Sequence, residues 1–199
     1  AAIENVNARQ DDNVTTVYVR VPDQDNIVIR PSGPLPPVDY PIRFDVLASD
    51  RVLLDGSNAG RSDGLVIRSG YCLLKYFIIA YWKGDGLVID GGEYNTIEQC
   101  TFRDNDTGER EIIAGITIQN SAYNTIRHTV VYGNRIHGIG IYGESSVGTV
   151  IEDCSIGYTR TGSPGAKRQT RGVRILYARE SKIRNTIIGN HAFAGILID

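Results

Sequence analysis

The chain has 199 residues, 41% hydrophobic and 22% charged, with 21 Lys and Arg against 23 Asp and Glu. This length suits one domain with a buried core, and the formal net charge of −2 argues against nucleic acid as a partner. No apolar stretch approaches the roughly 18–20 residues of a membrane-spanning helix, so no membrane span is expected. The chain contains no methionine and opens without a signal peptide, and we expect it to be a piece of a longer or processed protein.

The first 15 residues differ in character from the rest of the chain. Residues 1–15 are polar and without clear periodicity, which predicts an irregular N-terminal segment. Four segments rich in β-branched residues follow, at 16–20, 26–30, 41–44 and 52–57. Such short runs predict strands, so a second unit, a β-domain, is expected over 16–199.

A four-residue pattern of Gly, apolar, any, apolar then recurs along the chain at intervals of roughly 22–34 residues. Its copies begin at Gly64, Gly86, Gly115, Gly138, Gly172 and Gly195. Alternation with a period of two predicts that each copy is a strand with one inward aliphatic face.

A second kind of strand follows each glycine-led one and produces columns of similar residues. Aligned on these segments, two inward columns contain Phe77, Cys100, Thr129, Cys154 and Thr186, and Ile79, Phe102, Val131, Ile156 and Ile188. Stacked coils require such columns, because each coil buries its apolar face only against its neighbours. The sequence therefore predicts an all-β solenoid.

The Gly-Ile-x-Ile strands, each followed by an Asn-Thr-Ile type of strand, resemble the repeats of the pectate-lyase-like superfamily. The resemblance covers residues 16–199 and implies a right-handed, single-stranded parallel β-helix of about seven to eight coils. Two features depart from the family: residues 1–15 do not resemble its N-terminal capping helix, and residues 195–199 begin a new coil. We therefore expect an open C-terminal end, covered by more chain or by end-to-end self-association. The resemblance also implies a secreted or cell-surface protein.

The three cysteines, Cys72, Cys100 and Cys154, are predicted to be buried free thiols. Cys100 and Cys154 lie two coils apart, which at ~4.8 Å per coil exceeds the ~7 Å limit on the Cα distance of a disulfide. There is no Cys-x-x-Cys motif or His pair, so a zinc site is not expected.

The outward positions of the glycine-led strands form two further rows. One contains Val66, Val88, Thr117, Gly140, Arg174 and Leu197, and the other contains Arg68, Asp90, Gln119, Tyr142, Leu176 and Asp199. Parallel strands lie ~4.8 Å apart, close to the repeat of a sugar chain. These rows predict either a flat polysaccharide-binding face or an ordinary solvated sheet face.

Two insertions precede glycine-led strands and flank this face. The first contains Asp104, Asp106 and Glu109, which together with Asp90 are candidate ligands for calcium, a cation that prefers oxygen ligands. The alternative is a solvated acidic loop.

The second insertion, over 158–171, is basic and irregular, and Arg135 and His137 lie before the strand that precedes it. Such groups suit an acidic sugar polymer, because guanidinium binds carboxylate in a bidentate way. The candidate substrate-binding residues are Arg68, Gln119, Arg135, Arg168, Arg171 and Arg174.

Elimination from a uronic acid requires neutralisation of the carboxylate, a base and an acid. Related lyases and epimerases commonly use Lys, Arg, His or Tyr, so the resemblance implies Lys167, His137 and Tyr142 as catalytic candidates. A hydrolase is less favoured, because Asp63 and Asp85 precede glycines and are explained as turn residues.

Two hypotheses remain open. The first is an extracellular β-helix that acts on an acidic (uronate) polysaccharide by β-elimination or epimerisation. The second is a non-catalytic module for glycan binding or for filament, surface or tail-fibre assembly. Tyr94, Tyr123, Asn105 and Asn134 are predicted to stack at turns under either hypothesis.

Overall fold

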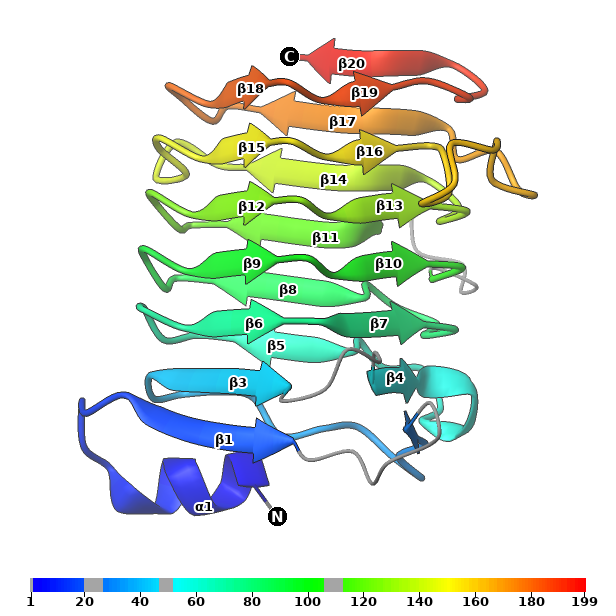
Figure 1. Cartoon of the computed structure of the whole chain (residues 1–199). Helices are drawn as coiled ribbons and strands as arrows, with labels where there is room; N and C mark the ends of the chain where they lie inside the picture. Colours follow the sequence, from blue (N-terminus) through cyan, green and yellow to red (C-terminus); the bar gives the residue numbers. More distant parts are fainter. Residues whose placement is uncertain (1, 20–26, 47–51, 106–112) are drawn as a thin grey trace.

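The computed structural model describes residues 2–19, 27–46, 52–105 and 113–199. This part of the chain winds through about seven coils, and the coils stack their strands into three parallel sheets (Figure 1). All the named strand pairs are parallel, with each strand paired to its counterpart in the next coil. The prediction of an all-β, right-handed parallel β-helix is confirmed.

The strands divide among the sheets as follows. The first sheet contains β1 (Thr15–Val19), β3 (Ile42–Val46), β6 (Leu73–Lys75), β9 (Thr96–Glu98), β12 (Thr125–Arg127), β15 (Val150–Glu152) and β18 (Lys182–Arg184). The second contains β2 (Val28–Ile29), β4 (Val52–Asp55), β7 (Phe77–Ala80), β10 (Thr101–Arg103), β13 (Val130–Tyr132), β16 (Ser155–Ile156) and β19 (Ile187–Ile188). The third contains β5 (Leu65–Ile67), β8 (Leu87–Asp90), β11 (Ala114–Gln119), β14 (His137–Tyr142), β17 (Arg171–Leu176) and β20 (Ala194–Ile198).

The core consists of aliphatic columns that run along the axis of the helix. Phe102 pairs with Ile79 on one side and with Val131 on the other, as the sequence columns predict. Ile116 and Ile139 form part of a second column from the third sheet, and both are fully buried. Each buried aliphatic side chain of this size contributes about 1.5–3 kcal/mol, so the coils are held together by their stacking.

Asparagine and tyrosine columns fix the corners between the sheets. The backbone N–H of Asn105 donates to Oδ1 of Asn134 over 3.0 Å, and the Asn134 amide donates to the carbonyl of Phe102 over 3.2 Å. A side chain on Gly115 would collide with the Asn134 amide, which explains why glycine opens this strand segment. Tyr94 and Tyr123 stack with ring centroids 5.1 Å apart, so the prediction that both columns stack at turns is confirmed.

The N-terminal segment differs from the sequence expectation. Ala2–Arg9 form α1, and β1 begins at Thr15, so this segment is not irregular throughout. Ile3 and Val6, three positions apart, face the core and are buried. A helix of eight residues offers only these two inward apolar positions, and this short pattern gave no periodicity that sequence analysis could detect.

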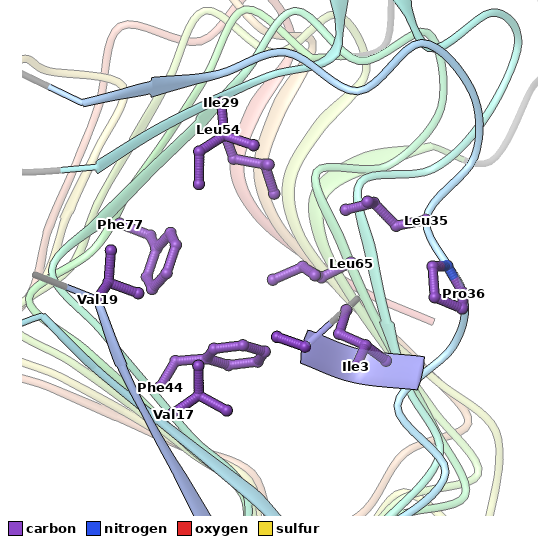
Figure 2. Close-up of a pocket in the computed structure, with 11 residues that line it drawn as sticks. Ile3, Val17, Val19, Ile29, Leu35, Pro36, Phe44, Leu54, Leu65 and Phe77 are labelled. Atoms are coloured by element: carbon purple, nitrogen blue, oxygen red, sulfur yellow. The ribbon is translucent and has the colours of Figure 1, made fainter. Parts of the chain in front are cut away.

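An apolar cavity of about 240 Å³ lies at the N-terminal end of the β-helix. Figure 2 shows side chains from α1, β1, β2, β3, β4, β5 and β7 that converge on it, together with Leu35 and Pro36 from a connection. Within the described residues, its wall consists of apolar side chains.

The opposite end presents apolar side chains on the last coil. β20 pairs with β17, and the exposed fractions of Phe193, Ile196 and Ile198 are 70%, 45% and 70%.

The cysteines are free and buried, as expected. Burial raises the pKa of the Cys100 thiol to about 12, so it stays protonated and unreactive at neutral pH. No helix in the described part of the chain is long and apolar enough to cross a membrane.

Candidate functional site

Six of the candidate site residues lie on strands of the third sheet: Asp90, Gln119, His137, Tyr142, Arg171 and Arg174. The strand register aligns Val88, Thr117, Gly140 and Arg174 in one row across β8, β11, β14 and β17. A second row aligns Asp90, Gln119, Tyr142 and Leu176 at the carboxyl ends of the same strands. The strand register therefore aligns the residues of both expected outward rows.

The middle of this face is not the open, flat ladder that the sequence predicts. Val88, Thr117 and His137 are 8%, 5% and 0% exposed. On β14, the Tyr142 ring lies back over Gly140, where an added Cβ would collide with the phenol. Glycine at position 140 therefore leaves the space that the tyrosine fills.

His137 lies at the beginning of β14, next to Ala114 on one side and Arg171 on the other. Its side chain is completely buried, and neither ring nitrogen has a hydrogen-bond partner among the described residues. Burial, together with the nearby charges of Arg171 and Arg174, lowers the pKa of His137 to about 4. The imidazole is therefore neutral near pH 7 and has one nitrogen that can accept a proton.

Tyr142 and the two arginines complete a compact group with His137. The Tyr142 hydroxyl is buried, and burial raises its pKa despite the nearby charges of Arg174 and Arg171. It therefore keeps its proton at neutral pH and can donate it. Both arginines influence the pKa of the histidine and of the tyrosine, which agrees with the close approach that the strand register imposes.

The arginines of this group are only partly satisfied. Arg174 makes a long ion pair with Asp199 (3.4 Å), and the Arg171 guanidinium lies 5.0 Å from the centre of the Phe193 ring. The Nε atoms of Arg171 and Arg174 are buried and have no partner in the described ranges. Guanidinium groups so placed favour a carboxylate ligand.

Asp85 belongs to the same face, although the residues around it predict only a turn role. Its carboxylate accepts hydrogen bonds from the Ala114 backbone N–H (2.5 Å) and from the Thr117 hydroxyl (2.8 Å). It is buried, and its charge also contributes to the raised pKa of Tyr142. Its position directly before a glycine-led strand, next to the outward row, is the sequence feature that could have indicated a place on this face.

We refer to His137, Tyr142, Arg171, Arg174 and Asp85 as the third-sheet cluster. Gln169 and His191 also lack partners for buried polar atoms, but an added Cβ on Gly138 or Gly172 would meet them. They therefore continue the corner column of Asn105 and Asn134 and are separate from the cluster.

Other predicted site residues lie apart from these contacts. Lys167 is exposed, with no ion pair in the described part of the chain, and Arg168 donates to the carbonyl of His191 over 2.6 Å. Arg68 lies 3.8 Å from the Asp39 carboxylate, near the N-terminal coils. Arg135 is exposed, and its carbonyl accepts a hydrogen bond from Thr170 N–H.

The candidate calcium ligands do not converge within the described residues. Asp90 ends β8 and accepts a hydrogen bond from the Asn120 amide (3.3 Å), whereas Asp104 follows β10 and pairs with Arg103 (2.8 Å). Asp106 and Glu109 lie outside the described residues. The described ranges contain no group of three or more His, Cys, Asp or Glu side chains able to hold a metal ion.

Comparisons with known proteins match most of the repeats to a protein family. Residues 52–199 match the family model described as right-handed beta helix region. No curated protein matches the chain.

Two solved structures are similar in fold. One is tailspike protein 3 of bacteriophage CBA120, at 16% identity and a TM-score of 0.39, covering 94% of this chain. The chain spans only 32% of that tailspike's length. The other is an alginate lyase from Paenibacillus sp. str. FPU-7, at 13% identity and a TM-score of 0.35, covering 92% of this chain and 71% of that one.

Proposed function

The chain belongs to the right-handed β-helix family, and we propose that its third-sheet cluster acts on an acidic, uronate-containing polysaccharide outside the cell. The reaction is β-elimination or epimerisation, both of which begin with removal of the proton next to the carboxylate. One observation carries this proposal: a histidine, a tyrosine and two arginines lie together with buried polar atoms that have no hydrogen-bond partner among the described residues.

Burial of polar groups without hydrogen-bond partners lowers the stability of a folded protein. A buried donor or acceptor without a partner costs about 1–3 kcal/mol, and folded proteins keep few of them. A carboxylate placed between Arg171 and Arg174 would satisfy both guanidinium groups. The same ligand would bring the carbon next to that carboxylate towards His137 and Tyr142.

The protonation states suit the chemistry. With its carboxylate held by the arginines, the sugar loses the adjacent proton to the neutral His137 more readily, because the developing negative charge is stabilised. The electrons of the broken C–H bond then form a double bond to the neighbouring carbon, and the bond from that carbon to the glycosidic oxygen breaks. Tyr142 donates its proton to that oxygen. For epimerisation, a proton returns to the opposite face of the same carbon instead.

The test is incubation with a panel of uronate polysaccharides. Ultraviolet absorbance detects the unsaturated product of elimination, and proton NMR of the recovered polymer detects epimerisation. We expect His137→Asn to lower the rate about 100-fold or more. The matched control is His128→Asn, because His128 is exposed on the turn after β12. A product formed equally fast by both variants contradicts the assignment of His137.

Calcium at Asp90, Asp104, Asp106 and Glu109 remains a prediction, and the same assay addresses it with a chelator. Loss of activity that added calcium restores supports a calcium site. Unchanged activity indicates that the arginines alone neutralise the carboxylate.

The second candidate is a non-catalytic module for glycan binding or assembly. The complete burial of His137 favours it, because a substrate must reach this side chain for chemistry to occur. The exposed apolar residues on the last coil also offer a surface for self-association. Saturable glycan binding without product, together with dimers in sedimentation that Ile198→Asp abolishes, would support this candidate.

A further inference from the structure

A second site is formed by the outer face of the first sheet, away from the third-sheet cluster. A groove of about 620 Å³ crosses β1, β3, β6, β9 and β12, which stack one above the other in Figure 1. This volume lies within the roughly 300–1,000 Å³ typical of ligand pockets. The groove is open to solvent, in contrast to the buried face of the third sheet.

An aromatic wall borders the groove. Tyr71, Tyr94 and Tyr123 stack in succession, with ring centroids 5.4 Å and 5.1 Å apart. Tyr71 stacks on Tyr94, lines the groove and is 64% exposed, so its ring is accessible to a ligand. An aromatic face of this kind packs well against the C–H face of a sugar ring.

The charged residues of the groove differ in whether they form ion pairs. Glu98 pairs with Arg127 (2.7 Å) and with Lys75 (3.1 Å), so its negative charge is already matched. Arg43 also lines the groove, is exposed, and has no ion pair in the described part of the chain. The groove therefore presents one guanidinium group available to an anion.

Hydroxyl groups complete the polar lining. Thr16, Arg43, Leu73 and Thr96 occupy one row across four neighbouring strands, ~4.8 Å apart. The row therefore has one hydroxyl at each end, with the arginine and the leucine between them. This arrangement suits a chain molecule that runs along the axis and combines hydroxyls, apolar faces and acidic groups.

We propose that this groove binds one strand of an extended anionic glycan, with a carboxylate on Arg43 and a sugar ring against Tyr71. Binding here requires no chemistry and stands whether or not the third-sheet cluster is catalytic. In an enzyme, the groove would hold the polymer on the protein between turnovers.

Isothermal titration calorimetry with hexamers of galacturonate and of mannuronate tests the proposal. We expect Arg43→Ala and Tyr71→Ala each to raise the dissociation constant about tenfold, because each removes one charge-assisted or stacking contact. The matched controls are Arg61→Ala and Tyr177→Ala, both exposed and outside the groove lining. These controls should bind as the wild type does.

Two further titrations test the role of the ligand's charge and distinguish the groove from the third-sheet cluster. A neutral maltohexaose should bind at least about tenfold more weakly than the uronates, since it lacks the carboxylate that Arg43 pairs with. The titrations are repeated in a background carrying Arg171→Ala and Arg174→Ala, which removes the proposed carboxylate contacts of the third-sheet cluster. Binding that Arg43→Ala still weakens in this background separates the groove from that cluster. Wild-type affinity in both Arg43→Ala and Tyr71→Ala, or no binding of either uronate, overturns the proposal.

Discussion

The outer faces of the first and third sheets share one backbone design but treat their charged residues in opposite ways. On the first sheet, Lys75, Glu98, Arg127, Glu152 and Arg184 form one row of alternating charge across neighbouring strands. The carboxylates of this row each have a cationic partner in the row. On the third sheet, the corresponding central positions combine cations with neutral polar groups, and buried atoms of both have no partner in the part of the chain that the structure describes.

The contrast distinguishes charges that are matched between neighbouring coils from the charges that we propose serve a ligand. Ion pairs between neighbouring coils satisfy each other and contribute modestly to stability. Buried groups without partners cost stability and are retained where a ligand supplies the missing contacts. Four predictions break or sharpen this contrast.

The largest effect is expected from Tyr142→Phe. The substitution removes the proposed proton donor, so the rate of product formation should fall about 100-fold or more. The buried hydroxyl has no hydrogen-bond partner within the described ranges, so the free energy of unfolding should stay the same or rise by about 1 kcal/mol. Initial rates and urea unfolding measure the two quantities separately. A matched loss of stability and activity would mean that the hydroxyl is structural.

The next effect concerns the pH dependence of stability. The pKa of His137 falls to about 4 on folding, because burial and the arginines disfavour the charged ring. The unfolded chain, with an ordinary histidine pKa of ~6.5, takes up the proton first. The unfolding free energy should therefore be highest above pH ~6.5 and fall by up to about 3 kcal/mol as the pH approaches 4.

Urea unfolding of the wild type and of His137→Asn at several pH values tests this slope. In the variant, the decrease in unfolding free energy that begins near pH ~6.5 should be absent. The decrease at lower pH, which comes from protonation of carboxylates, should remain. Identical slopes in the two proteins would show that His137 titrates normally in the folded state.

A smaller effect is expected from Gly140→Ala. The added methyl group collides with the Tyr142 ring, so the ring must move and the protein should lose about 1–3 kcal/mol of stability. Activity should fall with it, since the phenol no longer lies over β14. Gly33→Ala is the control, because nothing lies within 4 Å of the added atom. Full activity in Gly140→Ala would contradict the position given to Tyr142.

The smallest effect is expected from Glu152→Gln on the first sheet. This substitution breaks the ion pair with Arg184, whose side chain is 63% exposed, and should cost about 1 kcal/mol or less. Turnover should not change, because the pair lies outside both proposed sites. The control is Glu144→Gln at an exposed position. A large loss of activity would show that the ion-paired face also takes part in function.

The sequence predicted the coils well, for a physical reason. Each coil must present its aliphatic residues to the same inward columns, so periodicity alone identified the strands and the neighbours of Phe102. It failed at α1, where an eight-residue helix leaves too short a pattern, and at Asp85, whose hydrogen bonds to the next coil depend on three-dimensional register.

The site was predicted only in part. Alternation placed Tyr142 and Arg174 on the outward side but could not show that the tyrosine bends back over Gly140. The burial of His137 likewise depends on how neighbouring side chains fold over the sheet. The charge and loop position of Lys167 make it a candidate, but neither property determines where an exposed side chain lies.

The most direct test is to observe the His137 imidazole while ligand is added. The chain has only three histidines, so ring resonances can be assigned by comparison with His137→Asn and His128→Asn. Titration with a galacturonate or mannuronate hexamer should shift the His137 resonances and raise its pKa from about 4, because a bound carboxylate offsets Arg171 and Arg174. His128 resonances should not move. Saturable binding of both hexamers that leaves the His137 resonances and pKa unchanged would contradict a ligand at the third-sheet cluster.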